Sequence, residues 1–88
     1  MEIVLLPQAE DDLNYWKEKG DARILKRIRT LLEDILQHPF SGLGKPEALK
    51  GTNGKWSRRI NDEHRWVYSI SSGMVYVYVI SLRYHYSK

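Results

Sequence analysis

The sequence predicts an α+β domain, in which an N-terminal strand and two helices are followed by consecutive antiparallel strands. One observation is size, because 88 residues suit a single domain that spans residues 1–88. A second is composition, because 42% hydrophobic and 28% charged residues are typical of a globular protein. The third is the hydrophobic pattern, which changes from helical periodicity to alternation beyond Gly54.

The N-terminal half predicts a strand and two helices. Glu2 to Leu6 is rich in Ile, Val and Leu, as strands are. Pro7 suits the first turn of a helix, which we expect to end at Gly20. Asp21 is the expected N-cap of a second helix, whose apolar residues recur at i, i+4, i+7 and i+8. This amphipathic helix should stop just before Pro39.

The C-terminal half predicts an antiparallel meander. The segment between Pro39 and Gly54, which contains Gly42, Gly44 and Pro46, is expected to be loop or irregular strand. Three candidate strands follow, at Trp56 to Ile60, Arg65 to Ile70 and Met74 to Leu82. Short turns join them, at lengths that suit antiparallel hairpins. The long amphipathic helix should cover one face of this sheet and leave the other for a ligand.

The residue types exclude several kinds of site. Without cysteine, the chain has no disulfide, thiolate zinc site or cysteine nucleophile. The three histidines, His38, His64 and His85, lack the i, i+4 pairing of a dedicated transition-metal site. No nucleophile elbow surrounds any serine. We therefore expect no metal ion and no other cofactor.

Neither a membrane segment nor an export signal is expected. The longest apolar run, Met74 to Ile80, is seven residues long, whereas a membrane helix needs roughly 18 to 20. The N-terminus carries an acid, Glu2, instead of a basic region and a cleavage site. A cytoplasmic protein with no membrane partner is the expectation.

Charge is divided unevenly along the chain. Residues 1–40 hold six Lys/Arg and eight Asp/Glu, a net −2, whereas residues 41–88 hold eight Lys/Arg and three Asp/Glu, a net +5. A local excess of positive charge attracts phosphates, although many small basic domains carry one for solubility alone. The C-terminal half is therefore a candidate for binding a polyanion.

Within the basic half, separate predicted elements carry a carboxylate, two guanidiniums and an imidazole: Glu47, Arg59, Arg65 and His85. Metal-free cleavage of RNA needs a base for the 2′-hydroxyl proton, an acid for the leaving oxygen and fixed positive charge at the phosphate. Glu47, Arg65 and His85 are residues of these types. Chemistry alone does not decide which residue plays which part.

Short motifs run through almost the whole chain: Asp-Asp at 11–12, Tyr-Trp at 15–16, Pro-Phe at 39–40, Gly-Lys-Pro-Glu at 44–47, Leu-Lys at 49–50, Trp-Ser-Arg-Arg-Ile at 56–60, Glu-His-Arg at 63–65, Val-Tyr at 67–68 and Arg-Tyr-His-Tyr at 83–86. Each motif is weak, but their order is specific. The chain resembles the RelE/YoeB-type toxins of bacterial toxin–antitoxin pairs, and the YoeB type most closely.

The resemblance implies a RelE-like fold and a ribosome-dependent mRNA interferase, which cuts mRNA in the ribosomal A site and leaves a 2′,3′-cyclic phosphate. It implies that Glu47 is the general base, His85 the general acid and Arg65 the phosphate clamp, with Arg59 and Tyr86 as supporting site residues. The implied partners are the 70S ribosome with its mRNA, a cognate YefM-like antitoxin and a second copy of the chain.

Further cationic and aromatic residues are expected to contact RNA: Lys45, Lys50, Arg58, Arg83 and Tyr84. On a strand, Arg58 and Arg59 must point to opposite faces, so we expect only Arg59 to face the site. Ala48 stands where relatives often have proline, and Ser87 and Lys88 follow the motif at which relatives commonly end.

The aromatic residues of the strands have more modest expected parts. Tyr76 and Tyr78 are two apart and should share one sheet face, as core or dimer contacts. Trp16 and Trp56 are expected to pack inside the protein, and Trp66 to lie at an interface.

Two alternative functions remain open at this point. One is a ParE-like toxin that is not an enzyme and inhibits a protein partner such as gyrase, which would not require the Glu/Arg/His set. The other is a plain RNA-binding module.

Overall fold

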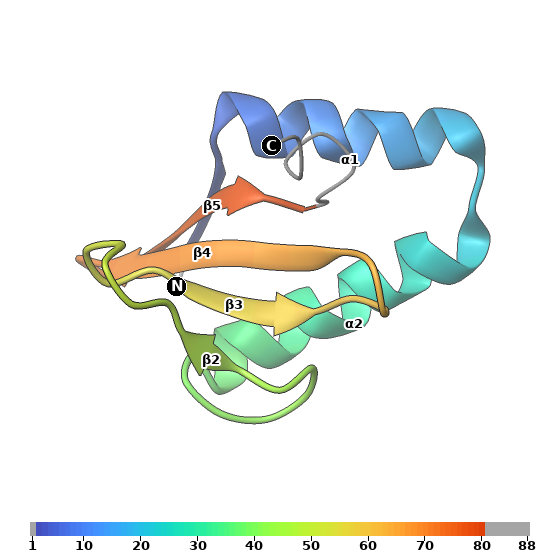
Figure 1. Ribbon diagram of the computed structural model, residues 1–88. Coiled ribbons are helices and arrows are strands. Elements are labelled where there is room, and N and C mark those ends of the chain that lie inside the picture. The colour runs from blue at the N-terminus through green and yellow to red at the C-terminus, as the bar shows by residue number, and fades with distance from the viewer. Residues whose placement is uncertain (1, 81–88) are drawn as a thin grey trace.

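The computed structural model describes residues 2–80 of the chain. These residues form two helices and a five-stranded sheet, so the predicted α+β class is confirmed (Figure 1). In chain order the elements are β1 (Glu2–Leu5), α1 (Pro7–Lys19), α2 (Ala22–Gln37), β2 (Glu47–Ala48), β3 (Trp56–Arg59), β4 (Arg65–Ser71) and β5 (Met74–Val79). β2 is a short strand within the segment for which the sequence predicted loop or irregular strand.

Both helices begin and end where local sequence signals predicted. Pro7 opens α1, and Gly20 closes it in a left-handed conformation (φ 68°) while its N–H donates to the carbonyl of Trp16 at 3.1 Å. Asp21 caps α2, because its Oδ1 accepts a hydrogen bond from the N–H of Ile24 at 3.1 Å. The helix hairpin therefore follows from capping and proline chemistry.

The strand order is β1-β5-β4-β3-β2. β3, β4 and β5 form the predicted antiparallel meander. β1, the N-terminal strand whose pairing the sequence did not predict, pairs in parallel with β5. The chain leaves β1 at one edge, passes through both helices and enters the sheet again at the opposite edge as β2 (Figure 1). The result is a mixed sheet.

Strand ends differ slightly from the predicted ones. β3 stops at Arg59, because the N–H of Ile60 donates to the carbonyl of His64 and so closes the turn. β4 continues through Ser71, which pairs with Met74 of β5. The two residues between them, Ser72 and Gly73, both have positive φ (52° and 75°), as a type I′ hairpin turn requires.

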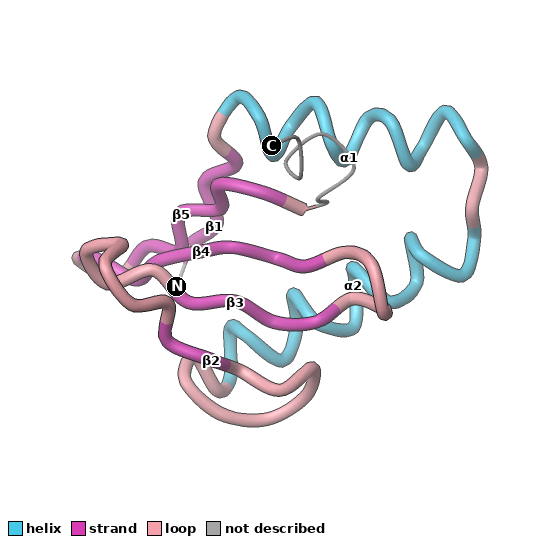
Figure 2. Tube along the Cα trace, in the orientation of Figure 1, coloured by secondary structure: helices cyan, strands magenta, loops and turns pink. Residues whose placement is uncertain are grey.

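The core lies between the helices and one face of the sheet (Figure 2). Its buried side chains come from both helices, from β4 and β5, and from the residues that directly follow β3 and β5: Ala9, Trp16, Ile28, Leu31, Ile35, Ile60, Trp66, Tyr68, Val75, Val77 and Ile80. The expectation of Trp66 at an interface is wrong, because this side chain is 1% exposed within the core. Trp16 is buried as expected, and Trp56 packs against Phe40 with ring centroids 4.9 Å apart.

The other face of the sheet carries the polar and basic side chains. On β5, Val75 and Val77 are buried in the core, and the alternating Tyr76 and Tyr78 point the other way, on one shared face as predicted. We refer to this side as the open face. Within residues 2–80, no helix is long and apolar enough to cross a membrane.

Candidate active site on the open face of the sheet

Glu47 and Arg65, which are distant in sequence, lie side by side on the open face. Antiparallel pairing sets Glu47 of β2 opposite Ser57 of β3, and Ser57 opposite Val67 of β4. Nη1 of Arg65 lies 3.6 Å from Oε1 of Glu47 and donates a hydrogen bond to Oγ of Ser57 at 3.2 Å. Glu47 and Arg65 therefore lie close together, as expected.

The pair is accessible to a ligand. The side chain of Glu47 is 65% exposed and that of Arg65 is 35% exposed. Exposed ion pairs add little to folding stability, so a gain in stability does not explain why the two side chains lie together. The Arg65 guanidinium has five N–H donors, and its one hydrogen bond within residues 2–80 is the bond to Ser57. Donors therefore remain for an oxyanion such as phosphate.

Ser57 belongs to this site, although it was not among the predicted site residues. It is 1% exposed, beneath the Glu47–Arg65 pair, and holds one nitrogen of Arg65. Strand alternation was the available signal, because it puts Ser57 on the same face as Arg59. No local sequence pattern shows that the side chain of Arg65 on β4 extends to Ser57 on β3.

Arg58 and Arg59 point to opposite faces, as predicted, and have different environments. Arg59 is exposed and pairs in register with Arg65. Arg58 is 0% exposed and lies on the core side, where it forms a salt bridge with Asp34 of α2. The expectation that Arg58 contacts RNA is therefore wrong, because the protein itself surrounds its guanidinium.

Other predicted RNA contacts are only partly within the described chain. Lys45 and Lys50 are exposed on either side of β2. The remaining predicted site residues lie outside the described residues: Arg83, Tyr84, His85 and Tyr86. Whether Lys45 and Lys50 contact RNA remains a prediction.

Lys55, which sequence reasoning did not single out, joins a cluster on the open face. Its Nζ lies 4.2 Å from the ring centroid of Tyr78, a cation–π distance. The hydroxyl of Tyr78 is 3.0 Å from Oγ of Ser69 on β4. This cluster adds another positive charge and an aromatic ring to the face that carries Glu47 and Arg65.

Two groups near Arg58 have shifted pKa values. The hydrogen bond from Arg58, helped by one from the backbone N–H of Leu43, lowers the pKa of Asp34 below its ordinary value. Burial raises the pKa of Tyr68, an effect that the Arg58 hydrogen bond partly opposes. Asp34 is therefore ionised and Tyr68 protonated at neutral pH.

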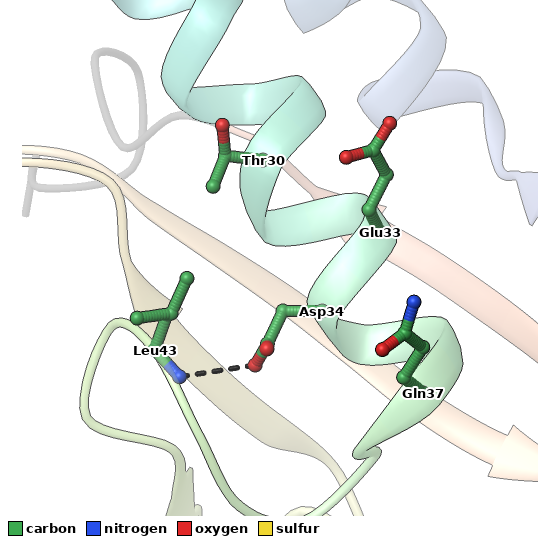
Figure 3. A pocket seen from close by; sticks show the side chains of 5 residues that line it. All are labelled: Thr30, Glu33, Asp34, Gln37 and Leu43. Atoms are coloured by element: carbon green, nitrogen blue, oxygen red, sulfur yellow. Dashed lines mark hydrogen bonds between the residues drawn. The ribbon is translucent and has the colours of Figure 1, made fainter.

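A pocket of about 220 Å³ lies between α2 and the loop that contains Leu43, and Figure 3 shows the side chains that line it. Thr30, Glu33, Asp34, Gln37 and Leu43 line it. Asp34 Oδ2 accepts the N–H of Leu43 there at 3.0 Å.

The residues 2–80 contain no group of three or more His, Cys, Asp or Glu side chains arranged to hold a metal ion.

Comparison with known proteins gives consistent matches over most of the chain. A family described as "YoeB-like toxin of bacterial type II toxin-antitoxin system" matches residues 6–86. The chain is 42% identical to Toxin YoeB of Escherichia coli K12, over 98% of this chain and 100% of that protein. It is 47% identical to Toxin YoeB of a Synechocystis strain, over 83% of this chain and 84% of that protein.

Solved structures agree with the sequence matches. A "YoeB/ParE toxin" from Agrobacterium tumefaciens superposes with a TM-score of 0.87 at 42% identity, covering 96% of this chain and 100% of that one. A YoeB dimer from Staphylococcus aureus gives 0.84 at 38% identity, covering 98% of each chain. The fold, the order of the motifs and these matches agree, and the chain belongs to the YoeB-like toxins of bacterial type II toxin–antitoxin systems.

Proposed function

We propose that this toxin is a metal-free endoribonuclease that cleaves mRNA in the ribosomal A site. In the reaction, a ribose 2′-oxygen attacks the neighbouring phosphorus, the bond to the 5′-oxygen breaks, and the upstream fragment ends in a 2′,3′-cyclic phosphate. The observation that carries the proposal is the exposed Glu47–Arg65 pair, whose Oε1 and Nη1 atoms are 3.6 Å apart.

In this proposal Glu47 acts as the general base. Its carboxylate is 65% exposed and lies beside a guanidinium, so a ribose hydroxyl next to a bound phosphate can reach it. A carboxylate that accepts the 2′ proton makes the oxygen nucleophilic as it attacks. General-base catalysis of this kind contributes about 10²- to 10⁴-fold to the rate.

Arg65 acts as the phosphate clamp. The planar guanidinium suits the non-bridging oxygens of a phosphate, whose negative charge grows during attack. Its hydrogen bond to Ser57 holds it in position before substrate arrives, which favours electrostatic stabilisation of the transition state. The exposed cations Arg59, Lys45 and Lys50 then contact neighbouring phosphates and add affinity that depends on salt.

The protonation of the leaving 5′-oxygen is assigned to His85, with Tyr86 as a supporting residue. This part of the proposal rests on the resemblance in the Arg-Tyr-His-Tyr motif at 83–86. An imidazole has a reference pKa of about 6.5, which suits a general acid near neutral pH.

The partners proposed for the chain follow from the family. Solved relatives from Staphylococcus aureus include a YoeB dimer and a YoeB-YefM complex, each with 96% or more of this chain covered. We extend both to this toxin, as a homodimer and as a target of a YefM-like antitoxin. Its substrate is mRNA on the 70S ribosome, which places its action in the cytoplasm.

The proposal is tested by expressing variants in bacteria and mapping RNA 5′ ends. Glu47→Gln, Arg65→Met and His85→Gln should each abolish growth arrest and strongly slow cleavage. Glu18→Gln and Arg23→Met, which change exposed residues of α1 and α2, are matched controls and should act like the parent.

Three outcomes count against this proposal or its assigned site. If the three site variants cleave RNA as well as the parent does, the assigned site is wrong. If the parent arrests growth without cutting RNA, the ParE-like alternative replaces the proposal. If it binds RNA and neither cuts it nor arrests growth, a plain binding module remains.

A further inference from the structure

Arg58 lies directly behind the candidate active site and holds the chain segment that leads to Glu47. The segment is the 38–44 loop, between α2 and the first residues before β2. The Arg58 guanidinium, 0% exposed, donates to groups of this loop and of its surroundings: Asp34 carboxylate, His38 carbonyl, Ser41 carbonyl at 2.6 Å, Leu43 carbonyl at 3.1 Å and Tyr68 hydroxyl at 3.1 Å. One buried side chain thus binds three carbonyls of a single loop.

Asp34 and Tyr68 complete the attachment of the loop. Oδ2 of Asp34 accepts the N–H of Leu43 at 3.0 Å (Figure 3). The same oxygen also accepts from Nη1 of Arg58. The Tyr68 hydroxyl, which accepts from Arg58, donates to the carbonyl of Pro39 at 2.7 Å. A buried charge that is paired and fully hydrogen-bonded is costly to disturb, so the loop has little freedom to shift.

The loop is the upstream support of Glu47. It ends at Gly44, whose carbonyl accepts the backbone N–H of Arg59 at 2.6 Å, and Glu47 follows three residues later. β2 has two residues, and both are exposed. Such a short edge strand has few contacts of its own to fix its place. The position of Glu47 therefore depends on the anchored ends of the segment.

We propose that the Arg58–Asp34 pair is a positioning device that holds Glu47 opposite Arg65. The inference rests on the proposed function, in which Glu47 is the base. The two adjacent arginines of β3 then have separate tasks: Arg59 faces the RNA, and Arg58 sets the geometry of the base from behind. Arg58 is a positioning residue, because it touches the loop and not the reacting atoms.

The expected effect of disturbing the pair is kinetic. Lysine at position 58 keeps the charge but offers a compact ammonium with three donors, which cannot bridge the same set of acceptors. A displacement of about 1 Å in a catalytic group costs roughly 100-fold in rate. We expect Arg58→Lys to lower kcat about 10- to 100-fold with KM nearly unchanged, since the exposed cations that bind phosphate remain.

A double-mutant cycle separates positioning from a general structural defect. Single-turnover cleavage of ribosome-bound mRNA is measured for the parent, Arg58→Lys, Glu47→Gln and the double variant. If Arg58 acts through Glu47, its replacement should slow the Glu47→Gln enzyme less than about threefold. If the loss of rate in the double variant equals the product of the two single losses, the inference is overturned. It is also overturned if Arg58→Lys has the parent's kcat.

Further controls keep the two proposals distinguishable. If Glu47→Gln alone cleaves like the parent, the proposed function fails; if it is slow while Arg58→Lys is normal, only the positioning role fails. If Arg58→Lys does not fold, Asp34→Asn replaces it in the double-mutant cycle with Glu47→Gln. Asparagine keeps the shape of Asp34 and one of its acceptor oxygens. Glu33→Gln, at the neighbouring exposed position of α2, should leave kcat and KM unchanged.

Discussion

Replacing Gly44 with alanine should destabilise the fold by more than the cost of holding an alanine at positive φ. Gly44 has a φ of +79°, and an added Cβ would lie 2.9 Å from Cδ2 of Leu31, 3.0 Å from the carbonyl oxygen of Arg59 and 3.3 Å from Cβ of Arg58. The left-handed conformation costs an alanine about 1 kcal/mol. Overpacking against a backbone oxygen that is itself in a strand adds about 1–3 kcal/mol.

Gly73→Ala is the matched comparison, because Gly73 has a φ of +75° and open space around the added Cβ. We expect Gly44→Ala to lower the free energy of unfolding by about 2–4 kcal/mol and Gly73→Ala by about 1 kcal/mol. The assay is urea unfolding followed by fluorescence of the three tryptophans. Equal losses for the two variants would refute the close packing of Gly44 against β3 and α2.

Three further predictions concern the anchor and the basic half. Tyr68→Phe removes the hydroxyl between Arg58 and Pro39, so urea unfolding should show a loss of about 1–3 kcal/mol, and no loss would contradict the buried hydrogen bonds. Because Arg58 lowers the pKa of Asp34 in the folded state, the carboxylate stabilises the fold above its ordinary pKa of 3.8 and this contribution disappears as the pH falls through the lowered value. The free energy of unfolding of Asp34→Asn should therefore be lower than that of the parent at neutral pH, and this difference should shrink below about pH 4. A difference that does not change with pH would argue against the ionic interaction. Ribosome affinity should fall steeply between about 50 and 200 mM salt, whereas a flat dependence would count against phosphate contacts by the basic half.

The sequence predicted the elements well where the signals are local. The ends of both helices follow from Pro7, Gly20, Asp21 and Pro39, each of which acts within one or two turns of chain. The meander follows from alternation and short turns. The parallel pairing of β1 with β5 is a contact between residues some 70 positions apart, and no local pattern encodes it.

The sequence anticipated that Glu47 and Arg65 lie together but not that Arg58 is buried. Glu47 and Arg65 were expected together and lie together, in part because strand register brings β2, β3 and β4 into line. Arg58 was expected to contact RNA, since strand alternation shows which residues share a face but not which face is buried. Its partner Asp34 is 24 residues away on α2, where it reads as an ordinary polar position.

The most direct measurement for the proposed chemistry is the single-turnover cleavage rate of one ribosome-bound mRNA by the parent and by Glu47→Gln, at saturating toxin and with ribosome affinity measured alongside. If Glu47 removes the 2′ proton, the rate should fall about 10²- to 10⁴-fold while the affinity stays within about threefold. A Glu47→Gln enzyme that cleaves at the parent's rate would contradict the assignment of the base.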